Sequence, residues 1–232
     1  MHVAIRIAAL PVLALVVAAC AGAANVAVDP TAAPTTAAPT TAAPATTAPA
    51  SGLSWTVSDK SKATVRVREQ LVGVSLPSDA VLTATGAKGS FGLNSDGTFA
   101  SGSTITFDLR TLASDSRDRD TFIKQDTLRV SQFPTATFVP TKATGLTLPL
   151  PATGDFTFTL TGTLTIRGKD KVAAFDVKGT RNGADLTATA TANPSLKFGD
   201  FGMTAPSVSF RVVSIVDEIR LVIDLVAVGP AS

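Results

Sequence analysis

The chain has 232 residues, a length typical of one or two domains, and its 20 Lys and Arg against 18 Asp and Glu leave a net charge of only +2. Lys and Arg are scattered, without the basic clusters that bind nucleic acid, which argues against a nucleic-acid partner. Because the single His is His2 and the single Cys is Cys20, the rest of the chain cannot form Ser-His-Asp or Cys-His catalytic sites, zinc sites built from His or Cys, or disulfides.

Residues 1–19 have the pattern of a secretory signal peptide, in which Arg6 precedes an apolar run from Ile7 to Ala19. This run has 13 residues and contains Pro11, whereas a membrane-spanning helix needs about 20 apolar residues. The pattern therefore predicts a signal peptide, and a short membrane anchor is the alternative.

The next residues, Val17-Ala18-Ala19-Cys20, resemble the bacterial lipobox, in which the Cys is diacylated and becomes the mature N-terminus. The alternative is an ordinary signal peptide with an incidental Cys. Because the chain has no other Cys, we predict a lipoprotein that is attached to membrane lipid through acylated Cys20. Two or three acyl chains are enough to hold a protein stably at a membrane. The expected location is the outer face of a membrane in the bacterial cell envelope.

From Ala21 to Gly52 the composition changes to Ala, Thr and Pro, with Thr-Ala-Ala-Pro-Thr recurring between Thr31 and Pro44. A segment without apolar periodicity cannot bury enough surface to offset the entropy lost on ordering. Pro-rich chains extend by about 3.1 Å per residue, so these 32 residues reach roughly 100 Å. Residues 20–52 are therefore predicted to be the lipidated Cys and a disordered tether.

Residues 53–229 are predicted to form one all-β domain, because apolar and polar residues alternate along them. The longest alternating segment runs from Phe156 to Ile166, with Thr at every second position. Six further segments alternate in the same way: 65–68, 105–110, 175–177, 186–190, 208–216 and 219–227. Turn sequences such as Asp96-Gly97 and Asn182-Gly183 separate the strands.

One segment, from Ser114 to Leu128, interrupts this pattern and predicts a short connecting helix. Ser114 or Ser116 would cap it, and aspartates would occupy its first turn. Long alternating strands with one inserted helix favour a closed up-and-down barrel, and a two-sheet sandwich is the alternative. A transmembrane barrel is disfavoured because a lipidated Cys and a tether would then be redundant.

The inward-facing positions of the predicted strands carry Val, Phe, Leu, Ile and many small Ala and Gly residues. The interior of a barrel of about eight strands is either filled by side chains or holds one ligand. Small lining residues would leave an apolar cavity suited to a long hydrocarbon. Alternatively, Ala and Gly only fit tight corners of a filled barrel.

Four ordered segments between Leu53 and about Val228 carry a resemblance to a known family. They are residues 55–57 with 61–63 and 65–69; Asp108-Leu109, 112–115, Arg119-Asp120, Leu128 and 133–138; 162–168; and 200–203 with Pro206-Ser207. On these residues the domain resembles the YceI-like family. Many members carry His in the first strand, where this chain has Ser61, Arg66 or Arg68.

The resemblance implies an all-β domain formed by an extended, lipocalin-like eight-stranded antiparallel β-barrel with one short inserted helix. It also implies that an isoprenoid-type lipid, a polyprenyl chain or a quinone, lies along the lumen. Arg119-Asp120 resembles a structural pair that locks the helix to the barrel.

The lipid tail is predicted to contact the apolar strand faces through Phe107, Phe156, Phe158, Leu160, Phe175, Phe210 and Leu225. The alternative for each of these side chains is an ordinary place in the core. Arg110 and Arg211 are candidates for binding a polar head group at the barrel mouth. No metal and no covalent cofactor are expected.

Two acidic groups suggest other chemistry. Asp115, Asp118 and Asp120 could form a calcium loop, but the spacing is wrong and Arg117 and Arg119 would repel the ion, so a helix cap with ion pairs is favoured.

Glycoside hydrolysis would need two paired carboxylates, for which Asp200 and Glu218 beside Asp217 are the candidates. These residues fit turns and strand ends better, and no nucleophile–base pair is available, so we do not predict an enzyme.

The sequence thus predicts a non-catalytic envelope lipoprotein that binds or carries an isoprenoid-type lipid. The alternative is a scaffold or adhesion barrel with a filled interior, presented on its Ala/Thr/Pro stalk. A cavity of several hundred Å³ would favour the first hypothesis.

Overall fold

The structure is a computed structural model that describes residues 52–206 and 212–229. The predicted signal peptide, Cys20 and the tether up to residue 51 lie outside the described residues, as do Phe210 and Arg211. Within the described part of the chain, no helix has the length and apolar character needed to cross a membrane.

Strands dominate the described residues, and short helical segments connect them. The strands are β1 (Leu53–Val57), β2 (Lys62–Leu71), β3 (Ser78–Ala84), β4 (Lys88–Leu93), β5 (Thr104–Asp108), β6 (Thr135–Thr144), β7 (Thr153–Ile166), β8 (Lys169–Asn182), β9 (Asp185–Ala192), β10 (Val212–Ile215) and β11 (Arg220–Val228). The helical segments are α1 (Arg117–Phe122), the 3₁₀ turns η1 (Leu109–Thr111) and η3 (Phe198–Phe201), and the π-helical turn η2 (Ile123–Thr127).

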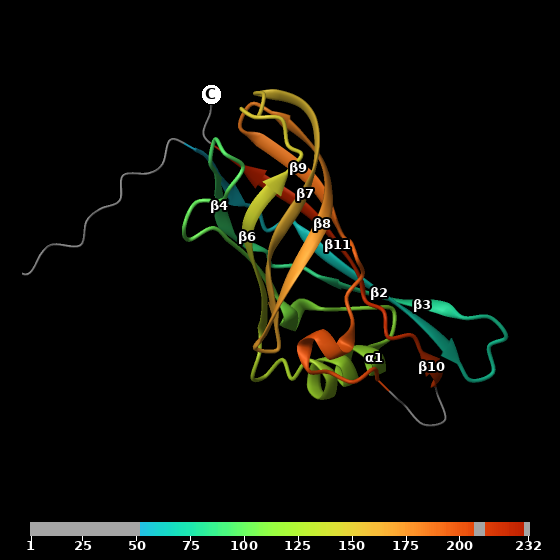
Figure 1. Ribbon diagram of the computed structural model, residues 1–232. Coiled ribbons are helices and arrows are strands. Elements are labelled where there is room, and N and C mark those ends of the chain that lie inside the picture. The colour runs from blue at the N-terminus through green and yellow to red at the C-terminus, as the bar shows by residue number, and fades with distance from the viewer. Residues whose placement is uncertain (1–51, 207–211, 230–232) are drawn as a thin grey trace, which may run out of the picture. The chain divides into compact units, whose positions relative to one another are not determined.

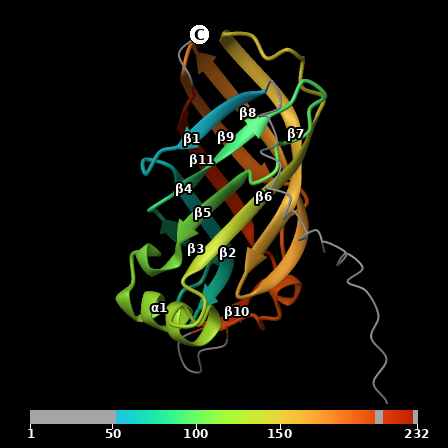
Figure 2. The ribbon, with the colours of Figure 1, turned by 90° about the vertical axis from the view of Figure 1, so that its left-hand side faces the viewer.

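Eight of the strands close into an antiparallel barrel in the order β1-β4-β5-β6-β7-β8-β9-β11, and β1 pairs with β11 to complete the ring. Figures 1 and 2 show the barrel from two directions. This closure confirms the predicted eight-stranded antiparallel barrel and excludes the two-sheet sandwich.

The other three strands extend one side of this barrel. β2 pairs with β11 over Arg220–Asp224, β3 pairs with β2, and β10 pairs with the end of β2. The β2–β3 hairpin therefore projects past the body of the barrel, on the side where β10 lies (Figure 1).

The strand pattern predicted from alternation holds best in the β7–β8 hairpin. Leu160 pairs with Phe175, and Phe158 pairs with Val177, so large apolar side chains meet on one face. The predicted segment 175–177 is only the middle of β8, which has 14 residues. Of the predicted segment 208–216, the structure describes residues 212–216, and β10 lies within them.

The predicted helix is confirmed as α1. It begins after Ser116, whose hydroxyl oxygen accepts a hydrogen bond from the backbone N–H of Arg119. Asp118 and Asp120 lie in the first turn, where the positive end of the helix favours carboxylates.

Gly179 in β8 is a position where the barrel has no room for a side chain. A Cβ built there would lie 2.5 Å from Cζ of Phe156 and 2.5 Å from the backbone oxygen of Thr187. The Phe156 ring therefore packs directly over the strand.

We predict that Gly179→Ala lowers the free energy of unfolding by about 1–3 kcal/mol, because the backbone of β9 cannot move away from the added methyl group. Gly199→Ala is the control, since a Cβ at Gly199 meets no atom within 4 Å, and it should change the stability by less than about 0.5 kcal/mol. Urea denaturation measures both, and equal midpoints for the two variants would contradict the prediction.

Candidate functional site

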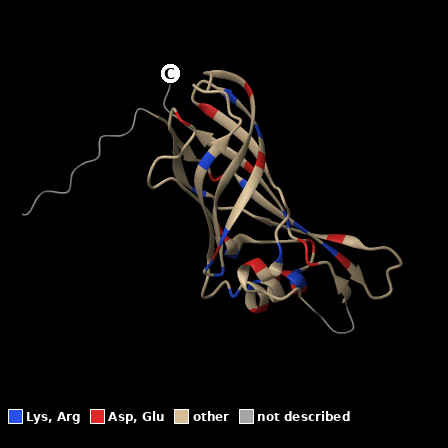
Figure 3. Cartoon of the chain, viewed as in Figure 1, with Lys and Arg blue, Asp and Glu red and all other residues tan. Residues whose placement is uncertain are grey.

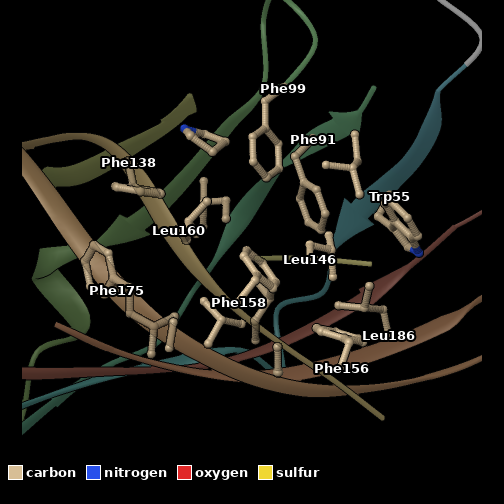
Figure 4. A pocket seen from close by; sticks show the side chains of 18 of the residues that line it. Trp55, Phe91, Phe99, Phe138, Leu146, Phe156, Phe158, Leu160, Phe175 and Leu186 are labelled. Carbon is tan, nitrogen blue, oxygen red and sulfur yellow. The ribbon is translucent and has the colours of Figure 1, made fainter. Parts of the chain in front are cut away.

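The domain contains two cavities of very different size. The smaller one has a volume of about 70 Å³, and its lining is entirely apolar. Figure 4 shows side chains from several strands converging on it. Five of the residues predicted to contact a lipid tail line this small cavity: Phe156, Phe158, Leu160, Phe175 and Leu225.

Aromatic rings fill the barrel around the small cavity. The rings of Trp55 and Phe91 stack with centroids 5.5 Å apart, and Phe138 and Phe175 meet edge to face at 5.2 Å. The guanidinium of buried Arg181 lies over the Trp55 ring at 5.6 Å from its centroid. Because ligand pockets usually have about 300–1,000 Å³, a cavity of about 70 Å³ is too small for such a ligand. We call this end of the barrel, which aromatic side chains fill, the closed end.

The larger cavity, at the other end of the barrel, has a volume of about 880 Å³. Inward-facing residues of β2 and β3, such as Val67 and Leu82, form one wall. The opposite side comes from the helical segment, with Phe122 and Ile123, and from Met203 after η3. Its volume falls in the range of ligand pockets, and its wall is mainly aliphatic.

Buried side chains that line neither cavity lie between the two, and we call Phe107, Leu164 and Leu221 among them the separating layer. On β5, Ile105 lines the small cavity and Leu109, just after the strand, lines the large one, while Phe107 between them lines neither. Leu164 on β7 and Leu221 on β11 lie in the same intermediate position, and all three residues of this separating layer are buried. Phe107, also predicted as a lipid contact, thus lies between the cavities.

A partly buried ion pair lies in the wall of the large cavity, where 6% of the Glu69 side chain and 20% of the Arg119 side chain are exposed. Nη2 of Arg119 on α1 lies 2.7 Å from Oε1 of Glu69 on β2, and both residues line the cavity. Arg119 also pairs with Asp115, whereas Asp120 accepts hydrogen bonds from the backbone N–H and the hydroxyl of Ser114. The helix is therefore held to the barrel by Arg119 and Glu69, and Asp120 instead binds the residues before the helix.

Arg110, one of the two predicted head-group residues, lies on the exterior. Its guanidinium forms an ion pair with Asp108 at 2.8 Å, and this contact lowers the pKa of the Asp108 carboxyl. Arg110 lines neither cavity. Its role with a head group stays a prediction, as do the roles of Phe210 and Arg211.

The carboxylates considered for glycoside hydrolysis make structural contacts. Asp200 accepts a hydrogen bond from the ammonium of Lys171 at 2.6 Å, and this contact lowers the pKa of its carboxyl. A general acid needs the opposite shift. Asp217 accepts from the backbone N–H of Phe198, and Glu218 accepts from the Ser195 hydroxyl.

The sequence does not predict most of the residues that line the large cavity. The alternation of Val65 and Val67 indicated their strand, but nothing local showed that their inward face would meet a helix. Phe122, Ile123 and Leu128 were visible as the apolar residues of the inserted helix, and they turn out to face the cavity. Within residues 52–206 and 212–229, no group of three or more His, Cys, Asp or Glu is placed to hold a metal ion.

A closed eight-stranded barrel with a short helix beside one open end defines the class of small lipocalin-like barrels. Residues 55–227 match the model of the YceI-like domain, and the chain belongs to this family.

Two solved structures share the fold. One is a polyisoprenoid-binding domain from Saccharophagus degradans implicated in plant cell wall breakdown, with a TM-score of 0.58 and 14% identity over 77% of this chain and 99% of that chain. The other is a variant of the Campylobacter jejuni YceI protein, with a TM-score of 0.51 and 18% identity over 70% of this chain and 91% of that chain. No curated protein sequence gives a significant match.

We predict that Arg119→Met lowers the free energy of unfolding by about 3–5 kcal/mol, because it leaves the carboxylate of Glu69 buried without its partner. The double variant Arg119→Met with Glu69→Leu should recover most of this loss. Arg68→Met, which breaks an exposed ion pair with Asp79, is the control and should cost less than about 1 kcal/mol. Urea denaturation measures the free energy of unfolding of each variant. A double variant that is as unstable as Arg119→Met would contradict the prediction.

Proposed function

We propose that this barrel binds the apolar tail of an isoprenoid-type lipid, a polyprenyl chain or a quinone, in its large cavity, and that it does so without catalysis. The observation that carries the proposal is the cavity of about 880 Å³ with a mainly aliphatic wall. A fold neighbour from Saccharophagus degradans, described as a polyisoprenoid-binding domain, supports the choice of ligand class. Removing hydrocarbon from water contributes about 25 cal/mol for each Å² buried.

The polar side chains of the cavity favour one orientation of the ligand. Ser116, Thr121, Gln125 and Asp126 belong to α1, its cap and η2, whereas the strands contribute mainly aliphatic residues. A head group would therefore lie beside the helical segment, and the tail would point toward the separating layer.

We further propose that the chain is an exported lipoprotein, anchored through acylated Cys20 to the outer face of a membrane in the bacterial envelope. The support is the lipobox-like sequence that ends at Cys20 and the lack of any other Cys. The barrel would then act close to a membrane that contains its ligand.

The direct test is native mass spectrometry of the full chain produced in a bacterial envelope, followed by solvent extraction. We expect one prenyl lipid or quinone per chain. A ligand-free mass, under conditions in which a control lipid carrier keeps its lipid, would overturn the proposal and favour the scaffold hypothesis.

Filling the large cavity should remove the ligand. We predict that Leu82→Trp or Ile123→Trp lowers the bound lipid at least about tenfold, because each side chain lines the cavity and the indole occupies the space of the tail. Val172→Trp, at an exposed position on β8, is the control and should bind as the unmodified chain does. Extraction and mass spectrometry measure the lipid, and circular dichroism shows whether each variant folds. A folded Ile123→Trp variant with full loading would contradict the prediction.

Opening the separating layer should change the length of tail that the barrel accepts. We predict that Phe107→Ala joins the two cavities and shifts binding toward longer prenyl chains, at a cost of about 3–5 kcal/mol in stability. Phe99→Ala, which enlarges only the small cavity, is the control. Competition between prenyl alcohols of different length measures the preference. An unchanged preference in the folded Phe107→Ala variant would show that the layer does not limit the tail.

A further inference from the structure

The tip of the β2–β3 hairpin exposes several aliphatic side chains. Val72 is 54% exposed, Val74 is 46% exposed and Leu76 is 74% exposed. We refer to these three residues as the apolar tip. The segment 70–78 around them contains no charged residue, and in Figure 3 the end of this hairpin is free of blue and red.

Other hairpin turns of the barrel are built differently. The β7–β8 turn carries Arg167 and is followed by Lys169, and the β4–β5 connection contains Asp96. Such polar turns are usual at a surface in contact with water, whereas a cluster of exposed aliphatic residues marks a site of interaction. The apolar tip therefore needs a partner.

The apolar tip is continuous with the large cavity. Val72 and Val74 line the cavity although about half of each residue is exposed. Beside them, β10 directs Val212 and Ile215 to the cavity, while Val213 is 65% exposed. An apolar path thus leads from the outside of the hairpin into the cavity.

We propose that the apolar tip, together with Val213, inserts into the surface of a lipid bilayer and places the mouth of the large cavity against it. A lipid tail would then pass between bilayer and cavity without crossing water. The significance of this contact for lipid transfer rests on the proposed function, but the contact itself depends only on the exposed tip.

The shape and charge of the hairpin favour a bilayer over a protein partner. A stable protein interface buries about 800 Å² and roughly 20–30 residues on each side, whereas the apolar tip and Val213 comprise four exposed residues. Insertion of a few aliphatic side chains suffices for weak and reversible binding to a bilayer. At the base of the tip, Arg68 and Arg220 share the single carboxylate of Asp79, so this ion-pair cluster has one net positive charge. Arginine side chains at this level suit the head-group region.

The length of the predicted tether is compatible with this contact. The described chain begins at Gly52, just before β1, whose Trp55 lines the small cavity, whereas no residue of β1 lines the large one. The 14 residues of β8 span about 46 Å, whereas the 32 residues after Cys20 can extend over roughly 100 Å. The tip can therefore reach the membrane that holds Cys20, and an acyl anchor with a weak second contact gives stable attachment.

The test uses the full chain with Cys20→Ser, which cannot be acylated and leaves no natural Cys. One variant adds Leu76→Cys and a second adds Val172→Cys, an outer position on the barrel that is 69% exposed. Both carry an environment-sensitive nitrobenzoxadiazole label and are mixed with phosphatidylethanolamine–phosphatidylglycerol vesicles. We expect a blue shift and a gain in fluorescence only at position 76.

A second measurement compares vesicle binding of the unlabelled Cys20→Ser chain with that of two variants made in it, Leu76→Asp and Val172→Asp. We expect Leu76→Asp to weaken it at least about tenfold and Val172→Asp to leave it unchanged. Equal responses at positions 76 and 172, or no binding of any variant, would overturn the proposal. A dimer that Leu76→Asp dissociates would also overturn it, because the tip would then cover a second copy.

Lipid content, measured on the same samples by mass spectrometry, separates this inference from the proposed function. Insertion of the tip by a chain that carries no lipid would leave the membrane contact standing and refute lipid binding. A lipid-loaded chain whose tip stays in water would refute the contact and leave lipid binding standing.

Discussion

The whole architecture depends on a break in the first strand of the barrel, between β1 and β2. At this break the completely buried Ser61 replaces part of the strand ladder. Its hydroxyl donates to the backbone oxygen of Val226 at 3.1 Å and accepts from the backbone N–H of Val226 at 2.9 Å. Because these two bonds satisfy β11 where the strand is interrupted, β1 can close the barrel while β2 continues along β11 to form a separate hairpin with β3.

Because β1 and β2 take separate paths, the two ends of the barrel differ in how their walls are built and filled. Where β1 pairs with both β4 and β11, the ring is complete and aromatic side chains fill it. Toward the other end, β5 pairs with β4 and not with β3. β3 meets the segment before α1 through the bridge between Thr83 and Ala113 and, just after the strand, through hydrogen bonds between Thr85 and Thr111. The wall there consists of a hairpin on one side and short helices on the other. The large cavity lies between these two parts of the wall.

The sequence allowed the fold to be predicted more completely than the site. Alternation over β7 and β11 is visible because each strand buries one face. β4 contains Gly89 and Gly92, and β6 contains Pro140 at an irregularity in its pairing, so neither shows a regular pattern. The predicted tail contacts are large residues on alternating faces, and five of the seven line the small cavity instead. The large cavity arises from a contact between β2 and α1, which are about fifty residues apart and share no local pattern.

The ion pair between Glu69 and Arg119 links the two sides of the large cavity. A pair of apolar side chains at the same place would often be at least as stable, because removing two charges from water is costly. Apolar side chains would, however, gain from any closer approach of α1 to β2, including one that collapses the cavity. The ion pair and its hydrogen bond at 2.7 Å instead favour one separation and one register of the helix. The ion pair thus fixes α1 beside β2, and the aliphatic wall of the large cavity lies next to this contact.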